Sequence, residues 1–383
     1  MNLVYLSTLI PKTMFDNVLN MGGGTYVVAP QKFHRLVVEG LIKNNQDIQV
    51  ISYLPPELHY TSNMNEGEIS YLFVNYNNIP GLKHLQIARG VVKAISVMIN
   101  EGRKPDFLIC DTLNVSVCLG ALIASKKYRI KTVGIVTDIL GMCSQEERGF
   151  INKIAFKVSN AYIRKFDRYI LLTEQMNAIV NPNNRPFIIM EGLCDSKRTI
   201  PANSDSSRIK IFYAGGRPSK DGVDLLIKAF KMIKRNDLQL HLFGNIPSDI
   251  SSLDDNDNRI FYHGIVDNDT VVKEELSSTI LVNPRPTGEL YTLYSFPSKI
   301  MEYMATGVPM ITTKLPGIPD EYFDYVFTFE SCDIESMKNT LETVIDMSPE
   351  VLINIGRKAQ DFVLLYKSNV AQSKRIVDFL INN

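Results

Sequence analysis

Two neighbouring stretches decide the fold of this chain: Leu281-Val-Asn-Pro-Arg285 and Tyr294-Ser-Phe-Pro-Ser-Lys-Ile-Met-Glu-Tyr-Met-Ala-Thr-Gly-Val-Pro309. The first begins as an apolar strand, and the second is a loop that becomes a short helix. The same alternation of short apolar runs with helix-length segments recurs along the chain, and it predicts parallel sheets covered by helices. In the first half the apolar runs are Val50–Leu54, Phe107–Cys110, Thr132–Val136 and Tyr169–Leu172.

This alternation starts twice, which predicts two Rossmann-like, doubly wound domains. The second series begins at Ile209–Tyr213, after a polar stretch of little periodicity, Asp195–Ser207. At 383 residues the chain is also too long for one ordinary core. We therefore expect an N-terminal domain over residues 1–193 and a C-terminal domain over residues 205–365. The last segment, 366–383, is amphipathic and could either cap the second domain or return to the first.

The composition is that of a globular protein without a global charge. Apolar residues make up 45% and charged residues 21% of the chain, and lysine plus arginine equal aspartate plus glutamate at 41 each. No overall field therefore favours nucleic acid or an acidic partner. The five cysteines are scattered and form no Cys-x-x-Cys pair, which suits a reducing cytosol. With neither a secretory signal nor a membrane-length apolar run, we expect a cytoplasmic protein.

The helix predicted after Pro297 offers a place for an anion. Pro297 is tolerated in a first turn, and Gly307 supplies a left-handed stop. Ser295 or Ser298 can cap the helix. Its first amide groups and the positive end of its dipole favour phosphate. Lys299 adds a cation in the first turn, where acidic residues are usual, and this position suggests an anionic ligand.

Glu302 lies about one helical turn further in, so its carboxylate can reach the same side and bind sugar hydroxyls. In the alternative interpretation, Lys299 and Glu302 form a solvated helical pair and the prolines only shape a loop.

The run from Ser295 to Pro309, followed by Pro316-Gly-Ile-Pro319, resembles the donor-binding segment of retaining glycosyltransferases of GT-B fold, specifically the large family four group. The resemblance implies an α/β protein with two Rossmann-like domains facing across a cleft. The N-terminal domain would bind the acceptor, and the C-terminal domain would bind a nucleotide-diphosphate sugar. The reaction would retain the anomeric configuration, and it would require neither a metal nor another cofactor.

Members of this family carry two glutamates separated by seven residues, and the second is implied to hold the ribose. Glu302 matches the second glutamate. Tyr294 stands in place of the first, and the nearby Glu289 is the candidate substitute. The donor contacts that the resemblance implies on this segment are Ser295, Phe296, Pro297, Ser298, Lys299 and Glu302.

The family's other donor motif is a glycine-containing strand end followed by an arginine and a lysine that neutralise the diphosphate. Tyr213-Ala-Gly-Gly-Arg-Pro-Ser-Lys-Asp221 resembles it, although the two cations are three residues apart instead of five and Asp221 stands where the lysine is usual. The alternative is a strand-to-helix turn with solvated charges. The candidates are Gly215 and Gly216 for donor contact, and Arg217 and Lys220 for stabilising the departing nucleotide.

Two places in the first domain also resemble the family. The loop Met21-Gly-Gly-Gly-Thr-Tyr26 allows close backbone approach, and Gly23 and Gly24 are implied to face the donor diphosphate. Taken alone, three glycines could also be a plain flexible loop. Further on, Thr137 takes the place of a histidine usual in relatives, and Asp138 is a candidate substrate contact or a helix cap.

The resemblance implies sugar transfer to a glycan or lipid-linked acceptor, as in bacterial surface polysaccharide synthesis. Two other functions stay open: a sugar-nucleotide 2-epimerase of the same two-domain form, and a noncatalytic module that binds nucleotide sugars or a partner enzyme. The segment 151–168 combines an apolar stripe with basic side chains. It could rest on an anionic bilayer as a peripheral contact, or be a core helix with a wet basic face.

Overall fold

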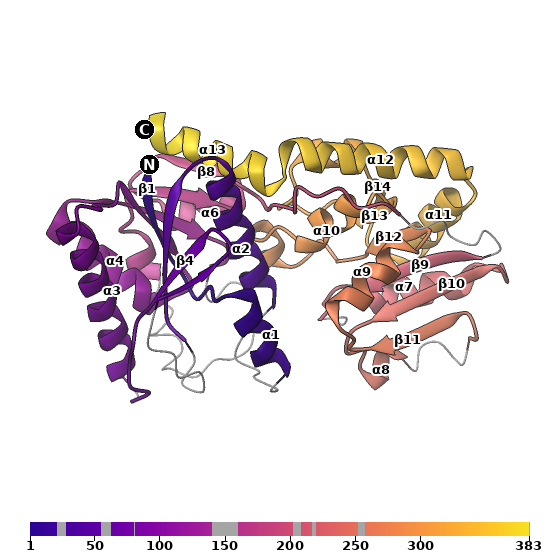
Figure 1. Ribbon diagram of the computed structural model, residues 1–383. Coiled ribbons are helices and arrows are strands. Elements are labelled where there is room, and N and C mark those ends of the chain that lie inside the picture. The colour runs from indigo at the N-terminus through magenta and orange to yellow at the C-terminus, as the bar shows by residue number, and fades with distance from the viewer. Residues whose placement is uncertain are drawn as a thin grey trace. The chain divides into compact units, whose positions relative to one another are not determined.

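The computed structural model describes residues 1–20, 28–54, 63–79, 81–139, 160–201, 208–216, 220–251 and 257–382. The chain divides into two compact units (Figure 1). Unit 1 contains Met1–Leu193 and Asn369–Asn383, and unit 2 contains Cys194–Ser368. Among the helices of these described ranges, none has the length and apolar character needed to cross a membrane.

Unit 1 is built on a twisted, mostly parallel sheet. Eight strands of its described part follow the order β3-β4-β2-β1-β5-β6-β7-β8, and only β3 runs antiparallel to its neighbour. Strands β5 and β7 are buried along their whole length, as expected for strands that carry helices on both faces. The strands are β1 (Asn2–Leu6), β2 (Asp47–Ser52), β3 (Met64–Glu66), β4 (Ile69–Phe73), β5 (Phe107–Asp111), β6 (Lys131–Val136), β7 (Arg168–Leu171) and β8 (Phe187–Ile189).

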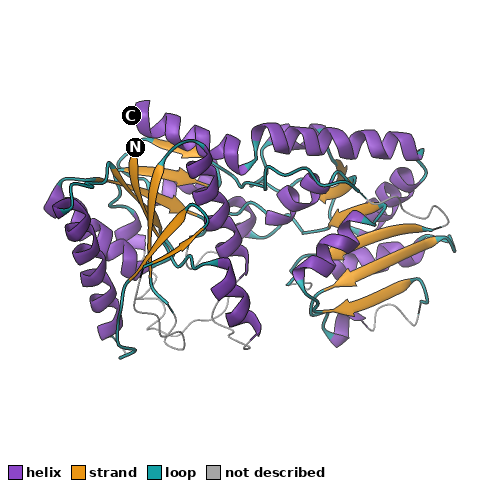
Figure 2. Cartoon of the chain, in the orientation of Figure 1, coloured by secondary structure: helices purple, strands orange, loops and turns teal. Residues whose placement is uncertain are grey.

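Helices cover both faces of this sheet (Figure 2). They are α1 (Lys12–Asn20), α2 (Val28–Lys43), α3 (Leu82–Asn100), α4 (Val115–Tyr128), α6 (Glu174–Val180) and, from the end of the chain, α13 (Asn369–Asn382). Helix α13 packs on α2 so closely that a Cβ added to Gly40 would overlap the backbone oxygen of Asn369. The hydroxyl of Ser373 also donates a hydrogen bond to the carbonyl of Val37 at 3.2 Å. Of the two placements open for the last segment, the return to the first unit is therefore the one found.

Unit 2 repeats the architecture with a fully parallel sheet. Its six described strands follow the order β11-β10-β9-β12-β13-β14. Numbered within the unit this order is 3-2-1-4-5-6, the order of a dinucleotide-binding Rossmann sheet. The strands are β9 (Ile209–Ala214), β10 (Leu238–Phe243), β11 (Ile260–Gly264), β12 (Ile280–Asn283), β13 (Met310–Thr313) and β14 (Phe327–Phe329).

The helices of unit 2 fill both sides of that sheet with apolar side chains, in two separate buried clusters. They are α7 (Val223–Met232), α8 (Ser248–Ser251), α9 (Asn268–Leu276), α10 (Ser298–Thr306), α11 (Ile334–Ile345) and α12 (Pro349–Tyr366), with 3-10 turns η2 (Leu290–Leu293) and η3 (Asp320–Asp324).

Helix α10 ends at the residue that the sequence predicts, but its start lacks the predicted serine cap. Gly307 takes the left-handed conformation at its end, with φ of 79°. At the start, Pro297 is the N-cap residue and no side chain caps the helix, so the prediction of a Ser295 or Ser298 cap is wrong. The cap fails because a proline occupies the position from which a serine hydroxyl would turn back onto the amides. The first turn of α10 thus keeps amide groups that no side chain caps.

Candidate functional site

The strand order of each sheet reverses once along the chain. In unit 2 the chain runs from β9 outward to β10 and β11 and then returns to β12 on the other side of β9. In unit 1 the same reversal falls between β1 and β5. Ligands of open α/β sheets bind outside the carboxyl ends of the strands at such a switch point. Each unit therefore has one place where a site is expected.

At the switch point of unit 2, the structure brings together two of the predicted donor residues, Gly215 and Lys299. Gly215 and Gly216 directly follow β9, and Lys299 lies in the first turn of α10. A Cβ added to Gly215 would overlap the hydroxyl of Tyr213 and lie 3.0 Å from Nζ of Lys299. A Cβ on Gly216, which is exposed, would meet no atom of the described residues within 4 Å. Gly215 is thus closely packed against the lysine, whereas Gly216 has open space beside it.

Asp221 is the centre of a buried charge cluster at this switch point. Arg285, just after β12, donates to its Oδ1 from Nε at 3.1 Å and from Nη2 at 2.9 Å. The hydroxyl of Tyr213 donates to Oδ2 at 2.8 Å, and Nζ of Lys299 lies 3.5 Å from the same oxygen. The side chains of Asp221, Arg285 and Lys299 are only 2%, 9% and 16% exposed. Because two cations share one carboxylate, this Asp221 cluster carries a net positive charge.

Burial and charge act in opposite directions on the pKa values of this cluster. Burial raises the pKa of the Asp221 carboxyl, but Lys299 and Arg285 outweigh it and leave the pKa below its ordinary value. Burial lowers the pKa of Lys299, and the charge of Asp221 opposes this only in part. Burial and the charge of Asp221 together raise the pKa of Tyr213, so its hydroxyl stays a donor. A second anion beside Lys299 would favour its charged form.

The other predicted residues of α10 and its loop differ in exposure. Ser298 is exposed and Glu302 is half-buried, one turn along the helix from Lys299. Phe296 and Pro297 are buried, and the Phe296 ring packs 5.3 Å from that of Tyr322. The Ser295 hydroxyl is buried without a hydrogen-bond partner among the described residues. Side chains of the loop therefore fix the start of α10, and only its helical residues offer polar groups outward.

The remaining candidates are spread more widely. Lys220 is exposed beside Asp221, and Glu289 is exposed as the residue before the turn η2. Asp138 is half-buried, two residues beyond the carboxyl end of β6. Outside the described residues lie Arg217, Gly23 and Gly24, and also residues 140–159, which hold about half of the basic segment 151–168.

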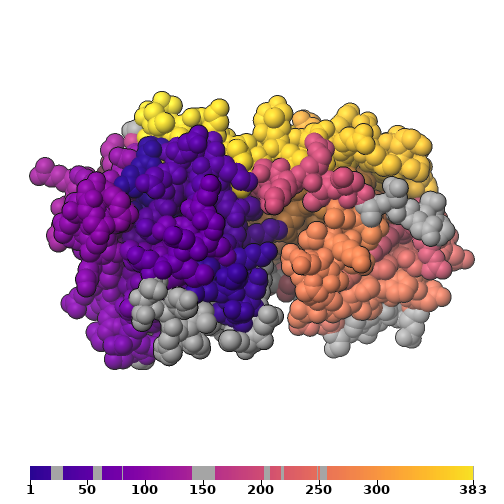
Figure 3. All heavy atoms as spheres, viewed as in Figure 1, coloured from indigo at the N-terminus to yellow at the C-terminus, as the bar shows by residue number. Residues whose placement is uncertain are grey.

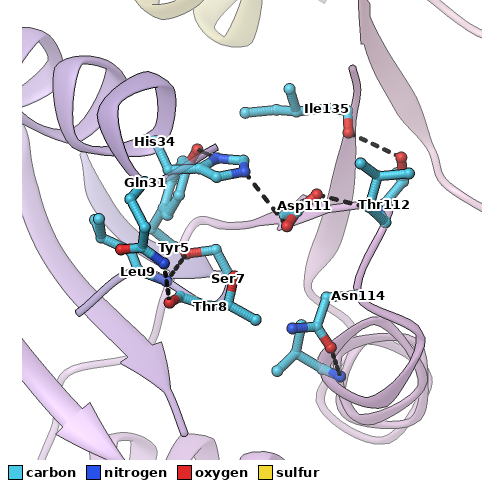
Figure 4. Close-up of polar contacts among 12 residues, drawn as sticks. Tyr5, Ser7, Thr8, Leu9, Gln31, His34, Asp111, Thr112, Asn114 and Ile135 are labelled. Atoms are coloured by element: carbon cyan, nitrogen blue, oxygen red, sulfur yellow. Dashed lines mark hydrogen bonds and ion pairs between the residues drawn. The ribbon is translucent and has the colours of Figure 1, made fainter. Parts of the chain in front are cut away.

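The switch point of unit 1 holds a second polar cluster, which sequence reasoning missed (Figure 4). The Tyr5 hydroxyl lies 2.6 Å from Nδ1 of His34, and Nε2 of His34 lies 3.3 Å from Oδ2 of Asp111. Burial, followed by the charge of Asp111, raises the pKa of Tyr5, so the phenol keeps its proton and can donate it to Nδ1. His34 then carries its proton on Nε2 and directs it at Asp111. We call these three residues the His34 cluster.

The loop after β5 extends this polar network. The amide of Leu113 donates to Oδ1 of Asp111 at 3.0 Å, and the Thr112 hydroxyl donates to the carbonyl of Ile135 in β6 at 2.9 Å. Asn114 caps α4 through the amide of Val117. The carboxyl ends of β1, β5 and β6 are thereby held together. One signal in the sequence could have revealed this cluster: Asp111 directly follows the apolar run Phe107–Cys110 at the end of a predicted parallel strand.

Two doubly wound α/β units in one chain are the architecture of the GT-B fold. Residues 208–346, which form most of unit 2, match the family described as Glycosyl transferases group 1. This match confirms the coarser part of the resemblance expected from the sequence, a group 1 glycosyltransferase of GT-B fold, and it supports sugar transfer as the activity. No curated protein matches the chain.

Solved structures show the same fold over the whole chain at low identity. Sucrose-phosphate synthase from Thermosynechococcus elongatus shares 14% identity with a TM-score of 0.64, covering 100% of this chain and 99% of its own. HepE from Anabaena in complex with UDP shares 14% with a TM-score of 0.65, covering 100% of both chains. A glycosyltransferase from Rickettsia africae shares 15% with a TM-score of 0.65, covering 100% of this chain and 99% of its own.

Proposed function

We propose that this protein is a retaining glycosyltransferase that moves a hexose from a nucleotide-diphosphate sugar to a glycan or lipid-linked acceptor. The observation that carries the proposal is the positively charged Asp221 cluster at the switch point of unit 2. Anionic ligands suit such a position, because the start of α10 adds uncapped amides to the two cations. The structural neighbour HepE is described in complex with UDP and with UDP-glucose, which supports this donor class.

Within the donor site, the distances suggest separate tasks for the two cations. Arg285 makes two short hydrogen bonds to Asp221 and is the more deeply buried, so it fixes the carboxylate. Lys299 has the longer contact and the more exposed side chain, so it can turn to a phosphate. We assign Lys299 and the amides of Ser298 and Lys299 to the diphosphate, and Glu302 to the ribose. Gly215 allows the close approach, and Arg217 and Lys220 would add charge from the loop.

The reaction breaks the bond between the anomeric carbon and the diphosphate oxygen and forms a bond to the acceptor hydroxyl on the same face. The departing diphosphate gains negative charge and takes the proton of the acceptor. Cations placed beside it stabilise that charge more in the transition state than in the ground state. In this proposal Lys299, Arg217 and Lys220 supply the stabilisation without a metal or other cofactor. Glu289 and the glycines of the loop 21–26 stay further candidates for donor contact.

Unit 1 is proposed to bind the acceptor. Asp138 and Asp111 both lie at the carboxyl edge of its sheet, where Asp111 is the last residue of β5 and Asp138 follows the adjacent β6. Asp138, which is half-buried, would contact the sugar hydroxyl, while the buried Asp111 holds the loop beside it. A polysaccharide of the bacterial surface is the acceptor class we propose. The reaction would then take place in the cytoplasm, with segment 151–168 as one peripheral contact.

The proposal is tested by Glu302→Ala. We expect the variant to keep its melting temperature and to lose donor affinity by about tenfold to a hundredfold, because a hydrogen bond to a charged group contributes about 1.5–3 kcal/mol. Glu335→Ala, an exposed glutamate on α11, is the matched control and should change nothing. Full transfer rate and donor affinity in Glu302→Ala would contradict the assignment. Release of an isomerised sugar without any acceptor would instead indicate an epimerase. Tight donor binding without turnover on any acceptor would indicate a binding module.

A further inference from the structure

Helices α3 and α4 pack against each other on the outside of unit 1 (Figure 1). The inner face of α3 is apolar and buried along its length, at Ile87, Ala88, Val91, Ala94, Ile95 and Met98. This face accounts for the packing of α3 on α4. Among the described residues of unit 1, the side chains on the outer face of the same helix are exposed instead of packed.

That outer face forms one continuous stripe. Leu82, Leu85, Arg89, Lys93 and Val97 follow at spacings of three or four residues, so they line one side of the helix. All five side chains are exposed, and the three apolar ones are 41%, 50% and 43% exposed. In Figure 3 the purple region of unit 1, to which α3 belongs by its colour, forms part of the visible surface. Exposed leucines at the start of the helix are therefore followed by cations and then by a valine.

The charged side chains within α3 and α4 all have one sign. Neither α3 nor α4 contains an aspartate or a glutamate. Their cationic residues are Lys83, Arg89, Lys93, Lys126 and Lys127. The whole protein is neutral, with 41 residues of each sign, so this is a local concentration of positive charge.

We propose that the outer stripe of α3 lies on an anionic lipid bilayer, with Leu82, Leu85 and Val97 in the headgroup boundary and Arg89 and Lys93 on lipid phosphates. Long cationic side chains beside exposed leucines suit this setting, because their stems lie along the apolar region while their charges reach the headgroups. The core of a protein interface is poor in lysine, which favours a lipid surface over a protein partner. The proposal goes beyond the proposed sugar transfer and does not depend on it.

The test is binding of the full chain to phosphatidylcholine vesicles with and without phosphatidylglycerol, measured by co-sedimentation. We expect binding only when the anionic lipid is present, and a decrease at higher salt. Arg89→Gln/Lys93→Gln should lower the partition coefficient by about thirtyfold, since two surface cations are lost. Leu82→Asn/Leu85→Asn should lower it by about tenfold or more, because apolar burial is lost.

Matched controls lie on α12 in unit 2. Arg357→Gln/Lys358→Gln removes one arginine and one lysine, as the charge variant on α3 does. Ile353→Asn/Leu365→Asn replaces two exposed apolar side chains, as the leucine variant on α3 does. Both control variants should bind vesicles like the unmodified protein. All variants should keep the melting temperature and the donor affinity, which separates this test from that of the transfer reaction. The proposal is overturned if the unmodified protein ignores anionic vesicles, or if the α3 variants bind them unchanged. Loss of self-association in the α3 variants, with vesicle binding intact, would assign the stripe to a protein contact instead.

Discussion

Arg285 donates two hydrogen bonds to a single carboxylate oxygen of Asp221, from Nε at 3.1 Å and from Nη2 at 2.9 Å. The resemblance to family four places a lysine at position 221, so the sign of the charge there is reversed. Cations at the same switch point come instead from Arg285 after β12 and from Lys299 on α10. Asp221 is thus the shared counterion of two cations that come from other elements of unit 2.

Replacing the counterion should destabilise unit 2. Asp221→Asn keeps the size of the side chain but leaves two buried cations without an anion, so we expect a loss of about 3–5 kcal/mol in the free energy of unfolding. Asp224→Asn, which removes the exposed partner of Lys228 at 3.9 Å, is the control and should cost less than about 1 kcal/mol. Urea denaturation of the two variants measures both values. Equal losses would show that Asp221 has no special part in the cluster.

The Asp221 carboxylate should make the free energy of unfolding fall at acid pH. The pKa of Asp221 is lower in the folded protein than in an unfolded chain, so its contribution is fully present above about pH 4. That contribution is lost as the pH falls through the lowered pKa, because the unfolded chain then takes up the proton first. Comparing urea midpoints of the unmodified protein and Asp221→Asn from neutral to acid pH should show their difference shrinking below about pH 4. A constant difference would contradict the assignment.

Lys299 should set an alkaline limit on donor binding. Burial lowers the pKa of its ammonium, so the charge that attracts a diphosphate is lost at a lower pH than an ordinary lysine, near 10.4, would lose it. The affinity for a nucleoside diphosphate, measured by calorimetry, should therefore decline as the pH rises toward that value. In Lys299→Arg the guanidinium stays charged, and the decline should move to higher pH or disappear. Identical declines in both proteins would exclude Lys299 as the titrating group.

The sequence predicted the repeated elements better than the contacts between them. Alternating apolar runs indicated both sheets, and Gly307 marked the end of α10, because these signals are local. The hydrogen bonds between Arg285 and Asp221 join residues 64 positions apart, and they depend on β9 and β12 being neighbours in the sheet. The contact between His34 and Asp111 likewise depends on how α2 lies over the sheet. Periodicity says which face of a helix is buried but does not say which strand end the helix covers.

Two adjacent glycines provide a steric test of the donor site. Gly215→Ala would place a Cβ in overlap with the hydroxyl of Tyr213 and 3.0 Å from Nζ of Lys299, so the tyrosine must shift and the lysine must give way, and donor affinity should fall by about tenfold or more. Gly216→Ala meets open space among the described residues and should leave the affinity within about twofold. Thermal shift with a panel of nucleotide sugars reads out both variants in one experiment. If Gly216→Ala lowers donor affinity more than Gly215→Ala does, the donor lies next to Gly216 and not beside Lys299.

The His34 cluster should contribute to the stability of unit 1 without affecting the donor. Tyr5→Phe removes the donor to Nδ1 of His34 and leaves a buried nitrogen unpartnered, so the free energy of unfolding should fall by about 1–3 kcal/mol. Tyr366→Phe removes a hydroxyl from an exposed side chain on α12 and is the matched control, with an expected change within about 0.5 kcal/mol. Donor affinity should stay unchanged in both, because Tyr5 belongs to unit 1 and the residues proposed for the diphosphate and the ribose belong to unit 2. An unchanged stability of Tyr5→Phe would mean that Nδ1 finds another partner, and the assigned proton on Nε2 facing Asp111 would then be wrong.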